Sequence, residues 1–156
     1  MTAEPLPPFS ELSPADARAV FDEFVRIEVP RWRDWLLHRS GLVHAEELDG
    51  SEQDLVRVWA GVVHEWRRTG LAPDSPDPGD EPEPLLGRIG GFGETMGPRP
   101  TRLAAGGGAF VGSWLVDRWR GTWVLTPARR GVAEGNEVCV DVPGGSGILP
   151  FSFAGV

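Results

Sequence analysis

The chain has 156 residues, 40% of them hydrophobic with seven Trp and seven Phe, a composition that predicts one folded domain over 1–156 and excludes a disordered chain. Its net charge of −8 disfavours bulk attraction to nucleic acid or anionic lipid and favours a cationic partner. All 15 basic residues are Arg and Tyr is absent, which excludes a Schiff-base lysine, a phosphate-loop lysine and a tyrosine acid. This bias is typical of a GC-rich, actinobacterial-like bacterial genome.

The N-terminal stretch MTAEPLPPFSEL has neither a basic start nor an apolar run, so it does not resemble a secretory signal. No stretch of the chain approaches the ~18 consecutive apolar residues of a membrane span. The single Cys139 cannot form an internal disulfide, which is typical of a reducing compartment. We therefore expect a cytoplasmic protein that makes no membrane contact.

The N-terminal third predicts two consecutive helices. Ser13 has the residue type of an N-cap, Pro14 suits the first helical position, and Asp16 can complete the cap. Apolar residues then recur at helical spacing up to Pro30, which we expect to end or kink the helix. The next segment, PRWRDWLLHRSG, predicts a second helix that buries Trp32, Trp35 and Leu36 and stops at Gly41.

A third helix is predicted from Ser51 to the residue before Gly70. At about 100° per residue, one narrow stripe contains Leu55, Trp59, Val62 and Trp66, with Val58 and Val63 on its flanks. This pattern indicates that the stripe is the buried face. His64 falls on the opposite side, so we expect it in solvent or at an interface.

The segment 73–100 is predicted to be an acidic, Pro/Gly-rich loop or linker. Its first part, PDSPDPGDEPEP, contains five prolines and five carboxylates and no basic residue, a composition that cannot form a packed core. These carboxylates are the candidate protein-binding residues: Asp74, Asp77, Asp80, Glu81 and Glu83. The following LLGRIGGFGETMG lacks the lysine of a phosphate loop, and Met96 replaces the third glycine of a dinucleotide fingerprint, so we interpret it as a hinge.

The remainder predicts one more helix and a small antiparallel sheet. TRLAAGGGAFVGSWLVDRWRG has an apolar face of Phe110, Val111, Trp114 and Leu115, and Gly107, Gly108 and Gly112 would let another backbone approach. The segments TWVLT, EVCVDV and ILPFSF then predict a β-meander, with the last strand at an edge because of Pro150. The expected fold class is α+β, with the helices packed on this sheet.

The C-terminal third resembles small uncharacterised bacterial domains in which a helix is followed by a G-x-W-V strand and a hairpin that ends in Pro-Phe. The matching residues are Gly112, Gly121, Trp123, Val124, Pro150 and Phe151. Ser113 stands where this pattern usually has Glu, and Phe110 where it has Tyr. The resemblance implies an α+β fold and no particular activity.

Catalytic and metal-binding patterns are incomplete. HEWRR places Arg68 where the second ligand of an H-E-x-x-H zinc motif would stand, and the other histidines, His38 and His44, have no ligand spacing. Cys139 lies in a predicted strand without a cationic neighbour, and Ser146 lacks the G-x-S-x-G elbow. We therefore expect neither a metal nor a cofactor.

These observations favour a non-catalytic protein-binding module, such as an adaptor or an immunity-type neutraliser of a basic partner. Two alternatives remain open. One is a small enzyme whose site is assembled from dispersed residues, with His64, Glu65 and Glu94 as candidates. The other is a single-stranded nucleic-acid binder that uses the Arg/Trp pairs in RWRDW, HEWRR and DRWRGTW, although helical stripes assign most of these Trp residues to the core.

Overall fold

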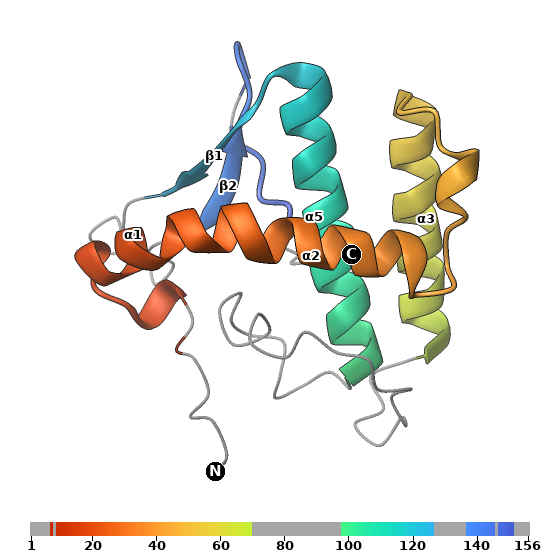
Figure 1. Ribbon diagram of the computed structural model, residues 1–156, viewed down its shortest axis with the longest axis horizontal. Coiled ribbons are helices and arrows are strands. Elements are labelled where there is room, and N and C mark those ends of the chain that lie inside the picture. The colour runs from red at the N-terminus through yellow and green to blue at the C-terminus, as the bar shows by residue number, and fades with distance from the viewer. Residues whose placement is uncertain (1–6, 8, 70–97, 127–136, 146, 152–156) are drawn as a thin grey trace.

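The computed structural model describes residues 7, 9–69, 98–126, 137–145 and 147–151, and these form an α+β arrangement as predicted (Figure 1). The helical elements, in chain order, are η1 (Phe9–Glu11), α1 (Pro14–Glu23), the π-helical segment η2 (Phe24–Glu28), α2 (Val29–His38), η3 (Ala45–Glu47), α3 (Glu52–Thr69) and α5 (Pro98–Trp119). Two strands, β1 (Thr122–Leu125) and β2 (Val138–Asp141), follow α5.

α1 and α2 form one helical path that passes through a π-helical segment. The Ser13 side chain caps α1 by accepting the Asp16 N–H at 3.2 Å, as predicted. Pro30 has no N–H to donate to the fourth residue before it, and directly upstream the Val29 N–H bonds to Phe24, five residues back. Pro30 therefore coincides with a widened turn instead of a helix end.

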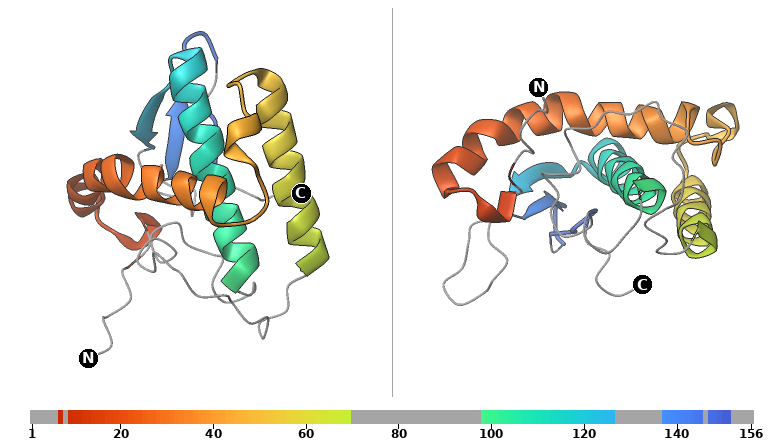
Figure 2. Two further views of the ribbon diagram at one scale, coloured as in Figure 1. Left: turned by 45° about the vertical axis from the view of Figure 1, so that its right-hand side comes forward. Right: turned by 90° about the horizontal axis from the view of Figure 1, so that it is seen from below.

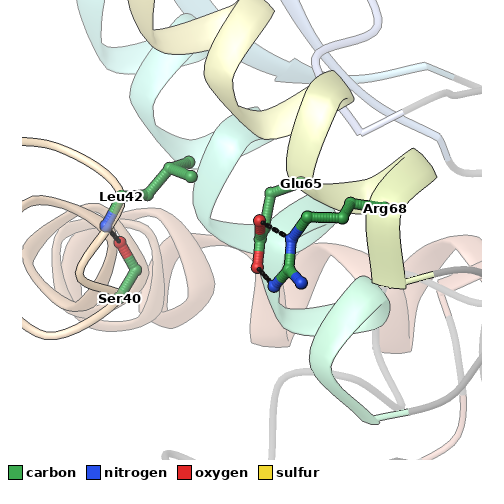
Figure 3. Close-up of polar contacts among 4 residues, drawn as sticks. All are labelled: Ser40, Leu42, Glu65 and Arg68. Atoms are coloured by element: carbon green, nitrogen blue, oxygen red, sulfur yellow. Dashed lines mark hydrogen bonds and ion pairs between the residues drawn. The ribbon is translucent and has the colours of Figure 1, made fainter.

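α2 ends where the sequence predicts. Trp32, Trp35 and Leu36 are buried, and Figure 1 shows α2 crossing α5. The Ser40 hydroxyl donates to the Leu36 carbonyl at 2.6 Å. It also accepts the Leu42 N–H at 3.1 Å, as Figure 3 shows. This hydroxyl satisfies one of the last carbonyls of α2 while the chain turns through Gly41, whose φ is +71°.

The buried face of α3 is rotated relative to the predicted stripe. Val58 and Val62 are each 1% exposed, whereas Trp59 and Trp66 are half-buried. A Cβ at Gly107 of α5 would lie 3.2 Å from Val62 Cγ1, so the helices approach most closely over the smaller branched side chain. The Trp59 ring also packs against Gly107, with its Cζ3 at 3.4 Å from such a Cβ. His64 is exposed, as predicted.

α5 is the central helix of the structure. Every residue from Arg102 to Phe110 is buried, and Figure 2 shows α2, α3 and the sheet around this helix. Three consecutive glycines of α5 each pack against a different part of the structure. Leu36 of α2 lies against Gly106, Val62 of α3 against Gly107, and Phe151 against Gly108.

The predicted backbone approach at the α5 glycines is confirmed at one of the three positions. The Pro150 carbonyl oxygen would lie 2.7 Å from a Cβ at Gly108. At Gly107 and Gly112 the close neighbours are side chains, namely Val62 and the indole of Trp123. The glycines of α5 therefore mainly make room for large side chains of other elements.

The sheet is smaller than the predicted meander. β1 and β2 are antiparallel with Trp123 opposite Val140, and the third predicted strand is reduced to a single bridge between Val140 and Ile148. The chain then turns at Pro150 so that Phe151 can reach the core, where it stacks on Trp123 with ring centroids 6.0 Å apart. The Phe151 side chain is therefore buried in the core, and this segment contributes only one bridge to the sheet.

Substituting glycines in two helices tests this packing. We expect Gly112→Ala to destabilise the protein by about 1–3 kcal/mol because the new methyl group would overlap the Trp123 ring. Gly61→Ala in α3 is the matched control, since its nearest neighbour would be Leu42 at an ordinary 3.7 Å. That variant should gain about 0.5–1 kcal/mol from helix propensity. Urea denaturation measures both, and equal effects would contradict the packing described.

Candidate functional site

The five candidate carboxylates Asp74, Asp77, Asp80, Glu81 and Glu83, together with Glu94 and Ser146, lie outside the described residues. The predicted linker 73–100 is described only from residue 98, where α5 begins. The acidic segment as a binding element therefore stays a prediction. The remaining candidates are all placed.

His64 and Glu65 do not converge. The Glu65 carboxylate is largely buried and accepts two hydrogen bonds from Arg68, at 2.8 Å from Nε and 2.7 Å from Nη2 (Figure 3). This hydrogen bonding and the charge of Glu65 raise the pKa of Arg68. His64 is exposed, because adjacent helical residues point about 100° apart. Glu65 thus serves an ion pair along α3 and does not form an acid–base pair with His64.

The other two histidines lie in separate exposed pairs. His38 Nε2 is 3.6 Å from Asp34 Oδ1 within α2, and His44 Nδ1 is 3.9 Å from Glu46 Oε1. Within the described ranges, no group of three His, Cys, Asp or Glu residues is placed to hold a metal ion.

Cys139 is buried in β2. Burial raises the pKa of its thiol, and the negative charges of Asp141 and Glu137 raise it further. A thiol held in the protonated form is a poor nucleophile. Val138 and Val140, on the opposite face of β2, are buried as well, so both faces of the strand are covered here.

Three of the seven tryptophans are buried in the core, and three more are half-buried. Trp32, Trp35 and Trp114 are all buried, and the first two make an edge-to-face contact at 5.7 Å. These rings cannot stack on nucleic-acid bases. Trp119 differs because it is 44% exposed at the end of α5.

Trp119 lies beside the loop that leads into α3. Its ring packs edge-on against Trp114 at 5.5 Å, and the Trp114 indole N–H donates to the Gly50 carbonyl at 3.3 Å. Arg118 Nη2 donates to the Asp49 carbonyl at 3.1 Å. We call the exposed parts of Asp49, Glu52, Arg118 and Trp119 the Trp119 surface. In Figure 1 the end of α5 and the start of α3 lie at the same end of the molecule.

The loop is fixed from the inside by Asp54. Its buried carboxylate accepts the Asp49 N–H at 2.7 Å and the Gly50 N–H at 2.6 Å. Gly50 has a φ of +81° and no side chain, and the guanidinium group of Arg118 occupies the space where a Cβ would be. These bonds hold the carbonyls of Asp49 and Gly50 toward α5.

Asp49 presents a carboxylate at this surface. Hydrogen bonds from Ser51 lower the pKa of Asp49, so the group is ionised at neutral pH. Glu52 is exposed in the first turn of α3, and the nearby η3 segment adds exposed Glu46 and Glu47. The Trp119 surface thus combines one aromatic ring with the carboxylates of Asp49 and Glu52 and the guanidinium group of Arg118.

In the sequence, Trp119 stands out only as a member of one of several Arg/Trp pairs. Trp119 follows Leu115 by four residues, a spacing that predicts the buried face of α5. It is exposed because α5 ends there. Arg120 adopts a φ of +55°, and the Gly121 N–H bonds to the Leu115 carbonyl at 3.1 Å, which turns the chain into β1.

Comparisons with known proteins give no relative for this chain. No protein-family model matches it, and no curated protein or solved structure shows significant similarity. Among the described residues, no helix is long and apolar enough to cross a membrane. Trp123 lies against Gly112 and stacks on Phe151.

Removing the Asp54 carboxylate should loosen the Trp119 surface. We expect Asp54→Ala to lower the free energy of unfolding by about 2 kcal/mol, because two backbone N–H groups lose a charged acceptor. Glu52→Ala is the control in the same turn and should change stability by less than about 0.5 kcal/mol, since Glu52 is exposed. Thermal and urea denaturation measure the difference. Equal losses for the two variants would contradict the bracing role of Asp54.

The free energy of unfolding should fall at alkaline pH because of the Cys139 thiol. Because its pKa is raised in the folded state, the unfolded chain loses its thiol proton first. Stability is therefore full below the ordinary thiol pKa of about 8.5 and falls as the pH rises through the higher folded value. Urea denaturation between neutral and alkaline pH should show this fall in the parent and a smaller one in Cys139→Ala. Identical profiles would contradict a perturbed thiol.

Proposed function

We propose that the protein is a non-catalytic binding module for a partner with a basic surface, of the adaptor or neutraliser type. The observation that carries this proposal is the half-exposed Trp119 ring, which packs against Trp114, whose indole N–H bonds to Gly50 next to the acidic Asp49. The net charge of −8 supports it.

The chemistry of the Trp119 surface favours a cationic side chain. A guanidinium or ammonium group over an indole face gains about 0.5–2 kcal/mol from the cation–π interaction, more where water is excluded. Neighbouring carboxylates add a charge-assisted hydrogen bond. Arg118 is also part of this surface, where its guanidinium group lies over Gly50 and bonds to the Asp49 carbonyl, so it offsets part of the negative charge.

Rigidity adds to affinity at such a surface. The Trp119 ring packs against Trp114, which is buried and hydrogen-bonded to Gly50. Ordering the Trp119 ring on binding therefore costs little conformational entropy. Tryptophan, tyrosine and arginine dominate the residues that carry binding energy in protein interfaces. The exposed acidic residues would act mainly on the rate of association.

The first test uses a fluorescently labelled, arginine-rich peptide as the basic probe. We expect Trp119→Ala to weaken its binding about tenfold, which corresponds to ~1.4 kcal/mol. Val56→Ala is the matched control, because Val56 is an exposed apolar residue of α3, 68% exposed and outside the Trp119 surface. Fluorescence anisotropy measures both affinities. Equal affinities for Trp119→Ala and the parent, or no binding by the parent, would overturn the proposal.

The second test concerns the acidic segment. We expect its neutralisation to slow association with the same peptide at low salt without changing the melting temperature, because exposed charges steer a cationic partner. The variant changes these residues together to Asn or Gln: Asp74, Asp77, Asp80, Glu81 and Glu83. Stopped-flow measurements should show that the difference disappears as salt rises past ~0.15 M. An unchanged rate would leave binding to the Trp119 surface alone.

A further inference from the structure

Two buried polar atoms belong to side chains one helical turn apart, where η2 passes into α2. The Oε2 atom of Glu28 and the indole Nε1 atom of Trp32 are buried, and neither has a hydrogen-bond partner in the described part of the chain. Leaving a buried donor or acceptor unpaired is unfavourable, more so for a charged group. Folded proteins pair the large majority of such groups with other protein atoms or with ordered water.

The two side chains share the buried face of the helical path. Glu28 has helical backbone angles and precedes Trp32 by four residues, a spacing that places side chains on the same face. Phe24 and Trp32, four residues to either side of Glu28, are 3% and 0% exposed. Aromatic side chains of a helix point back toward its N-terminus, which directs the Trp32 ring over the turn that contains Glu28. An acceptor and a donor therefore lie together at the margin of the core.

These two atoms require opposite roles from whatever lies between them. A carboxylate oxygen accepts hydrogen bonds, whereas an indole N–H only donates. A cation would suit Glu28 but face the positive end of the Trp32 N–H, and an anion would suit only Trp32. Within the described residues, no group of three His, Cys, Asp or Glu is placed to hold a metal ion. A hydroxyl group, which both donates and accepts, satisfies both atoms.

We propose that one buried water molecule bridges Glu28 and Trp32. The water accepts the Trp32 N–H and donates one of its O–H groups to Glu28 Oε2. Buried waters in proteins occupy such places, where they bond to polar groups that have no other partner. Glu28 is only half-buried as a residue, so solvent reaches the site beside its aliphatic stem. The bridge allows a carboxylate to interrupt the apolar face between Phe24 and Trp32.

The first experiment detects the water by NMR in the isotope-labelled full chain. We expect the Trp32 indole N–H to show a cross-peak at the water frequency. Its signs should be opposite in NOE and ROE spectra, which distinguishes a bound water from proton exchange. The Trp114 N–H is the internal control and should show no such peak, because it donates to the Gly50 carbonyl at 3.3 Å. Absence of the Trp32 peak would overturn the proposal.

A variant then tests the role of the carboxylate. Glu28→Leu removes the acceptor, so the water peak of Trp32 should disappear. Glu23→Leu is the matched control, because Glu23 is an exposed glutamate at the end of α1, and this variant should keep the peak. A peak that persists in folded Glu28→Leu, or that is lost equally in both variants, would overturn the bridge. The parent spectrum tests the proposal even if Glu28→Leu does not fold.

The second experiment is a double-mutant cycle measured by urea denaturation. Glu28→Leu alone leaves the buried Trp32 N–H without a partner, so the unfolding equilibrium constant should rise about tenfold. In a Trp32→Phe background no N–H remains, and the same substitution should change the constant by less than about threefold, since replacing both polar partners by apolar groups is nearly neutral. Equal effects in the two backgrounds would show that the two groups are not linked and would overturn the proposal.

Discussion

The packing around α5 is the constraint on which the rest of the structure depends. Every residue from Arg102 to Phe110 is buried, which a helix achieves only when other elements surround it. The Ala/Gly run in this stretch lets α2, α3 and the C-terminal segment approach from different directions. Glycines lower helix propensity by about 1 kcal/mol each relative to Ala, so the gain must come from the aromatic and aliphatic side chains packed against them.

How far the sequence predicts the structure depends on whether the signal is local. The Ser13 cap and the end of α2 near Gly41 depend on neighbouring residues, and both are correct. The buried face of α3 is offset from the predicted stripe, because Val58 on its flank is fully buried whereas Trp59 and Trp66 are only half-buried. Helical periodicity contains no information about the size of the gap on the facing helix.

The same distinction applies to the candidate site. The sequence points to charged residues in 73–84 but not to Trp119, because spacing from Leu115 indicates burial. Exposure of Trp119 depends on α5 ending there, and its orientation depends on Trp114 reaching Gly50, 64 residues earlier in the chain. Such a long-range contact leaves no periodic signal. The cap formed by Asp54 is local and could have been recognised as a fixed loop, but not as part of a binding surface.

The turn from α5 into β1 connects the Trp119 surface to the sheet. Trp119 ends α5 and β1 begins at Thr122, with the left-handed Arg120 and the buried Gly121 between them. Gly121 has no room for a side chain, because a Cβ would lie 3.2 Å from the Leu115 carbonyl oxygen and press on Val140. The turn therefore fixes the end of α5, and with it Trp119, relative to β1 and β2.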